Sequence, residues 1–324
     1  MKRREFLRAV AACGLAGASP RALSAAPPIP RVIFLDDSEM PQGERLQIFR
    51  QSLELAGLSA EHIRFEVAAM PGSDVRALRR ELGACVKRDP GAFVTVSADI
   101  AVNGIAYMAR IPLVMGTQID PVKLGIQGPA APRRHNVTGF SYDVPIDVKA
   151  FEVLADTFPD ARRVALVADR IWMEHHRGSL DVSEVNARFG IDIDLVIPAS
   201  PRSVEWEFER LLPSRTDACY VPNSDVTAFS APALIAFLQR HRMPHLFASD
   251  GALRLGALMS YGVRRDSHWL PMATMLRHVL SGAEASDMPF ERAREFLLGI
   301  NAAQAARMGL VIPKHIVRRA NLVI

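Results

Sequence analysis

Short polar stretches follow the apolar runs of this chain, and they hold the side chains best placed for chemistry. Carboxylates, hydroxyls and backbone amides gather there, next to segments typical of buried strands. Because the carboxyl ends of parallel strands meet at one edge of a sheet, ligands of such sheets bind at that edge. For any single stretch, an ordinary helix N-cap is the alternative interpretation. The candidate ligand-binding residues are Asp36, Asp37, Ser38, Ser97, Ala98, Gly116, Thr117, Asp120, Asp169, Asn223, Ser224, Asp250 and Tyr261.

Common catalytic motifs are missing from the sequence. It has no Gly-x-Ser-x-Gly elbow, no Gly-x4-Gly-Lys-Ser/Thr phosphate loop and no Gly-x-Gly-x-x-Gly dinucleotide motif. The nine histidines follow no metal-ligand spacing. We therefore expect no catalytic residue, no metal and no cofactor. Asp36 and Asp37 are expected to bind a ligand rather than to work as an acid–base pair.

The elements that position these stretches begin after an export signal. Residues 1–26 combine Lys2, an arginine pair at Arg3-Arg4, an alanine-rich apolar run and small residues at Ser24–Ala26. This order is typical of a cleaved signal peptide of the twin-arginine (Tat) type, and it predicts a periplasmic protein. A lipid anchor on Cys13, which follows Val10-Ala11-Ala12, is the alternative.

Charge and cysteine content narrow the function class further. The chain has 39 Lys+Arg and 35 Asp+Glu, but residues 1–25 hold five of the bases and one acid, so the mature chain is balanced at 34 each. This balance gives no reason to expect nucleic acid as a partner. Cys85 and Cys219 each lie in an apolar pattern, and we expect two buried thiols rather than a disulfide.

Apolar runs alternate with helix-period segments along the mature chain. Runs of four or five apolar residues alternating with helices predict parallel sheets covered on both faces. The first set has strands expected near residues 32–35, 63–67, 93–96 and 111–115, with helices over 46–57, 75–85 and 102–108. Residues 119–139, rich in Gly and Pro, are expected to be a connector.

A second set follows the connector. Its strands are expected near 164–168, 193–197, 218–221 and 245–248, with helices near 151–158, around Phe208 and Leu211, and near 234–238. Residues 258–261 and a helix over 266–280 could cross back between the two sets. We expect residues 27–139 plus about 262–284 to form one lobe, and 140–261 plus about 285–324 the other.

Three blocks of sequence, taken in order, resemble a known family. The first holds Ile111–Met115, Asp120–Val122 and Asn136–Gly139; the second Leu258–Gly262 and Leu280–Ala283; the third Asp287–Pro289, Ile300–Asn301, Ala305–Leu310 and Ile312–Pro313. From about Arg31 to the C-terminus, the chain is similar to ABC-transporter substrate-binding proteins of the tryptophan/tyrosine type. The twin-arginine leader is also common in that family.

The resemblance implies an α/β protein of the type I periplasmic-binding-protein fold, with two doubly wound parallel-sheet lobes joined by a hinge. It implies a non-enzymatic, monomeric protein that captures a small molecule, such as an amino acid, and delivers it to an ABC permease. An α-carboxylate would then bind at Ser97, Ala98 and Thr117. An ammonium would lie near Asp36, Asp120 or Asp250.

Two loops depart from the family pattern, so the ligand does not carry over. The first loop is Asp36–Glu39 where the family usually has Ser, Gly and Pro, and Asp169–Trp172 stands where it usually has Asn-Pro. Two other functions stay open. One is a periplasmic ligand-sensing module for a membrane receptor kinase; the other is a periplasmic enzyme that uses the acids of the cleft.

Overall fold

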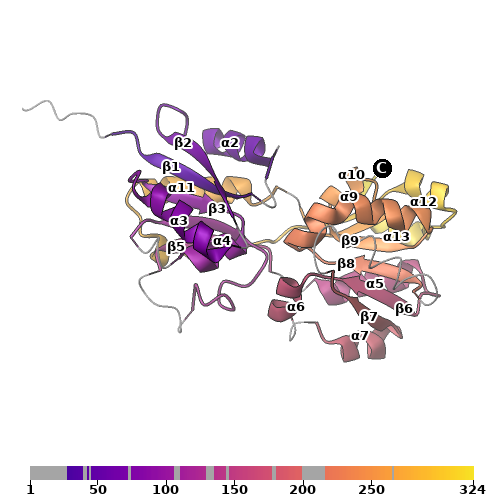
Figure 1. The fold of residues 1–324 in the computed structure, drawn as a ribbon. Helices are drawn as coiled ribbons and strands as arrows, with labels where there is room; N and C mark the ends of the chain where they lie inside the picture. Colours follow the sequence, from indigo (N-terminus) through magenta and orange to yellow (C-terminus); the bar gives the residue numbers. More distant parts are fainter. Residues whose placement is uncertain are drawn as a thin grey trace, which may run out of the picture.

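Two β-sheets, each flanked by helices, form the protein, and chain segments run between them (Figure 1). The computed structural model describes residues 28–38, 42–43, 45–71, 74–105, 110–128, 135–143, 146–176, 180–198, 216–264 and 266–324. The twin-arginine leader, Cys13 and the helix expected around Phe208 and Leu211 lie outside the described residues. Within the described chain, no helix is both long and apolar enough to cross a membrane.

The first sheet has the strand order β11-β5-β4-β3-β1-β2, and all neighbouring strands are parallel. Its strands are β1 (Arg31–Asp37), β2 (Arg64–Met70), β3 (Ala92–Thr95), β4 (Leu113–Thr117), β5 (Val137–Ser141) and β11 (Glu291–Arg292). The helices beside it are α2 (Arg45–Leu55), α3 (Val75–Val86), α4 (Ala98–Gly104) and α11 (Trp269–Leu280). We call this sheet with these helices the first half.

Helices cover both faces of the first sheet, which explains its uninterrupted apolar strands. Side chains of a strand alternate between faces, and β1 follows this rule. Val32 and Phe34 pack in one cluster with Trp269 of α11, whereas Ile33 and Leu35 pack in another with helix α3. Every one of these β1 side chains is at most 1% exposed. The apolar run Val32–Leu35 is therefore a strand buried on both faces.

The second sheet has the order β13-β12-β10-β9-β8-β6-β7. Only β12 runs antiparallel to its neighbour β10 among the described pairs. The strands are β6 (Arg163–Val167), β7 (Asp192–Val196), β8 (Ala218–Val221), β9 (His245–Ser249), β10 (Met259–Val263), β12 (Phe296–Ile300) and β13 (Leu322–Val323). With them lie α5 (Asp147–Thr157), α6 (Arg170–His176), α7 (Val182–Phe189), α9 (Asp225–Arg240), α10 (Gly251–Arg254), α12 (Ala302–Met308) and α13 (Lys314–Arg319), and together they form the second half.

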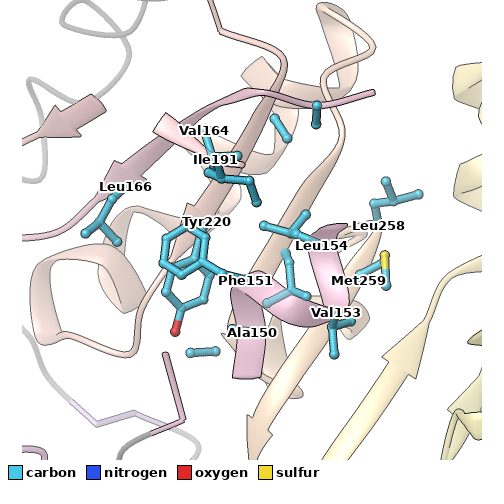
Figure 2. Packing of buried hydrophobic residues seen from close by; sticks show 14 of the residues in the cluster. Ala150, Phe151, Val153, Leu154, Val164, Leu166, Ile191, Tyr220, Leu258 and Met259 are labelled. Carbon is cyan, nitrogen blue, oxygen red and sulfur yellow. The ribbon is translucent and has the colours of Figure 1, made fainter. Parts of the chain in front are cut away.

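The core of the second half is built around Tyr220 of β8. Figure 2 shows Phe151 and Leu154 of α5 packed beside this ring, and the Phe151 and Tyr220 ring centroids are 5.1 Å apart. The Tyr220 hydroxyl donates a hydrogen bond of 2.5 Å to Asp147 at the start of α5. Burial, with a contribution from Asp147, raises the pKa of Tyr220 well above its usual value. The hydroxyl therefore stays protonated and ties α5 to the sheet.

The chain passes between the two sheets at three places. It leaves the first sheet after β5, returns to it between β10 and α11, and leaves again between β11 and β12. We expected the chain to pass to the second half for the last time near residue 285. Because β11 pairs with β5 of the first sheet, this passage lies between Arg292 and Phe296 in the structure. That the two halves move as separate lobes stays a prediction.

Two elements differ from the expectation. Strand β5 includes Val137–Gly139, which we expected to belong to a connector. Its five residues are all buried and pair with β4, although the sequence of this segment has no pattern typical of a strand. Helix α4 begins at Ala98 rather than near Val102, because the Ser97 side chain accepts a hydrogen bond from the Ile100 backbone N–H and caps it. The expected burial of Cys85 and Cys219 is confirmed.

Two glycines give a matched test of this packing. An added Cβ at Gly139 would lie 1.8 Å from the Met115 carbonyl oxygen, whereas one at Gly83 of α3 would meet no atom within 4 Å. We expect Gly139→Ala to lower the free energy of unfolding by about 3 kcal/mol, since β4 must shift. Gly83→Ala should raise it by up to about 1 kcal/mol, because alanine favours a helix. Urea unfolding measures both, and an unaffected Gly139→Ala variant would contradict the β4–β5 pairing.

His245 on β9 is fully buried and is held in its neutral form. Its Nε2 accepts a hydrogen bond of 2.8 Å from the Leu258 backbone N–H, so Nδ1 carries the proton and donates to the Met243 carbonyl oxygen at 2.8 Å. Burial lowers the pKa of His245 to about 4. Protonation would turn Nε2 into a donor that faces another donor.

The stability of the protein should therefore fall in mild acid. An unfolded histidine has a pKa of about 6.5, so between that pH and about 4 the unfolded state binds a proton that the folded state does not. The contribution is present above pH 6.5 and is lost as pH falls. From pH 7 to pH 5 it amounts to about 2 kcal/mol, and His245→Gln should lack this part of the loss. Urea unfolding at both pH values checks it; the same loss in both proteins would refute the assignment.

Candidate functional site

A cavity of about 320 Å³ lies where the two halves meet, at the carboxyl ends of strands from both sheets. The first half contributes Gln42, Arg45, Gln118 and Tyr142, which come after β1, β4 and β5. The connection from β10 to α11 contributes Val263, Arg264 and Asp266. The second half contributes the ends of β8 and β9 with the starts of α9 and α10: Val221, Pro222, Asn223, Thr227, Ala231, Pro232, Phe247, Ala248, Ser249, Gly251, Ala252 and Leu255.

The wall from the first half is polar and incompletely satisfied. The Gln42 Oε1, Arg45 Nε and Tyr142 hydroxyl atoms are buried, and none has a hydrogen-bond partner in the part of the chain that the structure describes. A buried polar atom without a partner costs about 1–3 kcal/mol. All three atoms are inaccessible to solvent, so they lie within the wall and not at the surface of the cavity.

The wall from the second half is mostly apolar. Side chains of Val221, Ala231, Phe247 and Leu255 line it, and Asn223 and Ser249 add polar groups at the strand ends. The nearby Thr227 hydroxyl is already engaged, because it bonds with Ser224 and with the Pro222 carbonyl. An apolar surface of this kind favours a ligand with a hydrocarbon or aromatic part.

Positive charge predominates among the described lining residues. Arg45 forms no ion pair within the described chain, and its guanidinium lies 6.0 Å from the centre of the Trp269 ring. Arg264 lies 3.7 Å from Glu295, with both side chains largely exposed, and the Asp266 carboxylate accepts a weak hydrogen bond of 3.4 Å from the Trp269 indole. Arg45 is therefore the charged group most available to a ligand.

His268 lies beneath this wall and adds no charge to it. It is 1% exposed, and its ring centroid is 4.8 Å from that of Tyr142 and 3.9 Å from that of Trp269. Burial, together with the Arg45 charge, holds the pKa of His268 well below its usual value. The positive charge at the wall thus comes from arginine and not from a histidine that titrates near neutral pH.

Asp36 and Asp37 support the wall from behind. Asp36 accepts a 3.0 Å hydrogen bond from the Gln42 backbone N–H, and Ser97 donates one of 3.3 Å to Asp37. Burial raises the pKa of Asp36; the Gln42 hydrogen bond opposes this shift, and the neighbouring Asp37 charge adds to it. Asp36 thereby holds the backbone of Gln42 in place, and with it the loop that leads to Arg45.

Of the candidate residues from the sequence, Asn223 lines this cavity. Thr117, Ser224 and Asp250 are chain neighbours of lining residues. Ser97, Asp169 and Ser224 cap α4, α6 and α9, which is the alternative stated for such residues. Asp120 accepts hydrogen bonds from the Val122 backbone and from Arg292, and the Ser38 backbone N–H donates to the Met70 carbonyl. Ala98 is the first residue of α4, Gly116 lies within β4 and Tyr261 lies in β10. Ligand contacts by the residues outside the cavity stay predictions.

Sequence reasoning missed Gln42, Arg45, Gln118, Tyr142 and Arg264. Gln118 and Arg264 each come directly after a strand, β4 and β10, and a search extended by one residue beyond Thr117 would have found Gln118. Tyr142 was hidden because β5 was expected to be a connector. Gln42 and Arg45 lie several residues beyond β1, and no local pattern marks them.

Comparisons with known proteins agree with this architecture. A family model described as ABC transporter substrate binding protein matches residues 72–324. No curated protein matches the chain in sequence.

Solved structures of similar fold cover most of the chain. A conserved domain protein from Vibrio cholerae is 19% identical with a TM-score of 0.78, and the match covers 91% of this chain and 100% of that one. An ABC domain from Streptococcus pneumoniae in complex with L-Trp is 17% identical with a TM-score of 0.75, again over 91% and 100%. A solute binding protein from Agrobacterium radiobacter in complex with D-arabinose is 13% identical with a TM-score of 0.58, over 87% and 97%. The expected type I periplasmic-binding-protein fold is confirmed.

Two tyrosines test whether the polar wall holds a buried hydroxyl without a hydrogen-bond partner. Tyr142→Phe removes a buried hydroxyl that has no partner in the described chain, so the free energy of unfolding should stay unchanged or rise by up to about 1 kcal/mol. Tyr220→Phe removes a hydroxyl bonded to Asp147 and should lower it by about 2 kcal/mol. Urea unfolding of both ligand-free variants makes the comparison. An equal loss in the two would mean that Tyr142 is already satisfied.

Proposed function

Because the chain belongs to the ABC transporter substrate binding protein family, we propose that it captures a small molecule in the cavity between its halves and delivers it to an ABC permease. The observation that carries this proposal is the cavity of about 320 Å³, whose lining residues come from both halves. The family is one of binding proteins, which agrees with the missing catalytic motifs. The protein would act as a monomer and without a cofactor.

Capture would work by shifting the balance between open and closed arrangements of the two halves. The cavity takes its lining from both halves and from the connection between β10 and α11. A ligand that touches both walls binds the closed arrangement more tightly than the open one, and it stabilises closure by that difference in affinity. The permease would then recognise the closed shape.

The place of work would be outside the cytoplasmic membrane. Proteins of this family are exported, and the twin-arginine pair at Arg3-Arg4 with small residues before Pro27 supports export through the Tat pathway with cleavage near Ala26. The sequence resemblance favours an amino acid as ligand. Neighbouring structures contain L-Trp in one case and D-arabinose in another, so the fold alone does not choose the class.

Binding is testable by a thermal-shift screen of residues 27–324 against amino acids, sugars, nucleobases and small carboxylates. A ligand present at a hundredfold excess over its Kd adds about 2.7 kcal/mol to the stability of the folded state. For a protein of this size the melting temperature should rise by roughly 4 °C. The compound should be recovered chemically unchanged. A compound that stabilises the protein but is consumed would indicate an enzyme instead.

Delivery is testable by uptake. Cells that lack the gene should lose accumulation of the radiolabelled ligand at low concentration and regain it when the gene is supplied on a plasmid. Arg3→Lys with Arg4→Lys should abolish the rescue if export follows the Tat pathway, because twin-arginine recognition requires both residues. Binding without any change in uptake would contradict delivery and favour the sensing role.

A further inference from the structure

Helix α9 has a proline near its middle, and this residue lines the cavity. The helix runs from Asp225 to Arg240, and Pro232 lies well beyond the first turn, where a missing N–H costs nothing. An α-helical N–H donates to the carbonyl four residues earlier. Proline has no N–H, so the Ala228 carbonyl lacks the helical donor that any other residue at position 232 would supply. The proline ring also crowds this carbonyl and tilts it away from the helix axis.

The side of α9 that holds the Ala228 carbonyl is the side that lines the cavity. The lining residues of this helix are Thr227, Ala231 and Pro232. With about 3.6 residues per turn, position 228 falls between Ala231 and Pro232 around the helix axis. Pro232 is exposed. The carbonyl therefore lies beside an opening that a ligand can enter, and not within the wall.

The surroundings of this carbonyl select the kind of group that binds it. The same wall presents carbon atoms of Ala231, Pro232 and Leu255 to the cavity. Ala228 is also about one turn from the start of α9, the positive end of the helix dipole, which disfavours an ammonium ion there. A neutral N–H or O–H on an apolar group, such as an indole or a phenol, satisfies both conditions.

Resting on the proposed function, we propose that Pro232 creates a binding subsite: the Ala228 carbonyl accepts a hydrogen bond from a neutral N–H or O–H donor on the apolar part of the captured molecule. In the empty cavity, water binds an exposed carbonyl of this kind, so the ligand gains only the net value of one exchanged hydrogen bond. That value corresponds to a roughly 2- to 10-fold difference in affinity.

Three pairs of probes, each differing in one donor, test the subsite by calorimetry on the purified protein. They are L-tyrosine with L-phenylalanine, L-tryptophan with 3-(3-benzothienyl)-L-alanine, and 3-(4-hydroxyphenyl)propanoate with 3-phenylpropanoate. In at least one pair, the compound with the donor should bind the native protein roughly 2- to 10-fold more tightly. In Pro232→Ala the new N–H bonds to the Ala228 carbonyl, so the two compounds of that pair should bind equally. A preference that persists in Pro232→Ala overturns the inference.

Two further proteins separate the carbonyl from the shape of the proline ring. Lactic acid placed at position 232 by cell-free translation forms an ester, which has neither N–H nor ring, and this protein should keep the preference for the donor. Loss of the preference in the ester as well would assign it to the ring and overturn the inference. Pro271→Ala is the matched control: Pro271 lies in the first turn of α11, where an N–H has no helical acceptor, so the preference should be unchanged.

Folding and binding are read separately. Because alanine is favoured over proline inside a helix, ligand-free Pro232→Ala should unfold at a higher urea concentration than the native protein, so a lost preference would not come from lost folding. A native protein that shows no preference in any pair, or binds none of the six probes, overturns this inference. Binding of another compound of the wider screen then leaves the proposed function intact. Absence of binding to every compound of that screen would refute both.

Discussion

Parallel strand pairing is the constraint on which the rest of this molecule depends. Between two parallel strands the chain must cross back to the end of the sheet where the strands begin. The strands of the first sheet, and those of the core of the second, therefore all end on the same side of their sheet. All polar ends of the strands then gather at one edge. Two sheets built in this way and linked by three passes of the chain leave a cavity lined by such edges from both halves. The position of the cavity thus follows from the topology, and the side chains at the strand ends then determine its chemistry.

Sequence patterns were sufficient wherever a segment is buried by its own composition. The run Val32–Leu35 and the face with Phe151 and Leu154 are found in the structure where periodicity placed them, because burial on both faces of a strand or one face of a helix leaves a direct mark. Strand β5 left no such mark. Its hydrogen bonds come from β4 and its glycine accommodates the Met115 carbonyl, so only the neighbouring strand makes it a strand.

The cavity was harder to predict than the sheets, and the reason is physical. A residue that binds a ligand between two halves is defined by a distance across the molecule, and helix caps use the same residue types at the same strand ends. Ser97 and Asp169 follow strands as the pattern requires, but they serve as helix caps. Arg45 lines the cavity, although it lies at the start of α2, beyond the loop that follows β1. Asp36 has an intermediate role. Its carboxylate does not line the cavity, but it accepts a hydrogen bond from the backbone of Gln42, which does line it.

The difference between the two walls of the cavity separates the speed of ligand arrival from the duration of its stay. A charged wall draws an anion over a distance comparable to the Debye length, so the rate of encounter depends on ionic strength and hardly on the shape of the ligand. An apolar wall acts only at contact, so it governs the rate of escape, which slows with each carbon atom buried. Arg45 and Phe247, which line one cavity from different halves, would therefore control different steps of a single binding event.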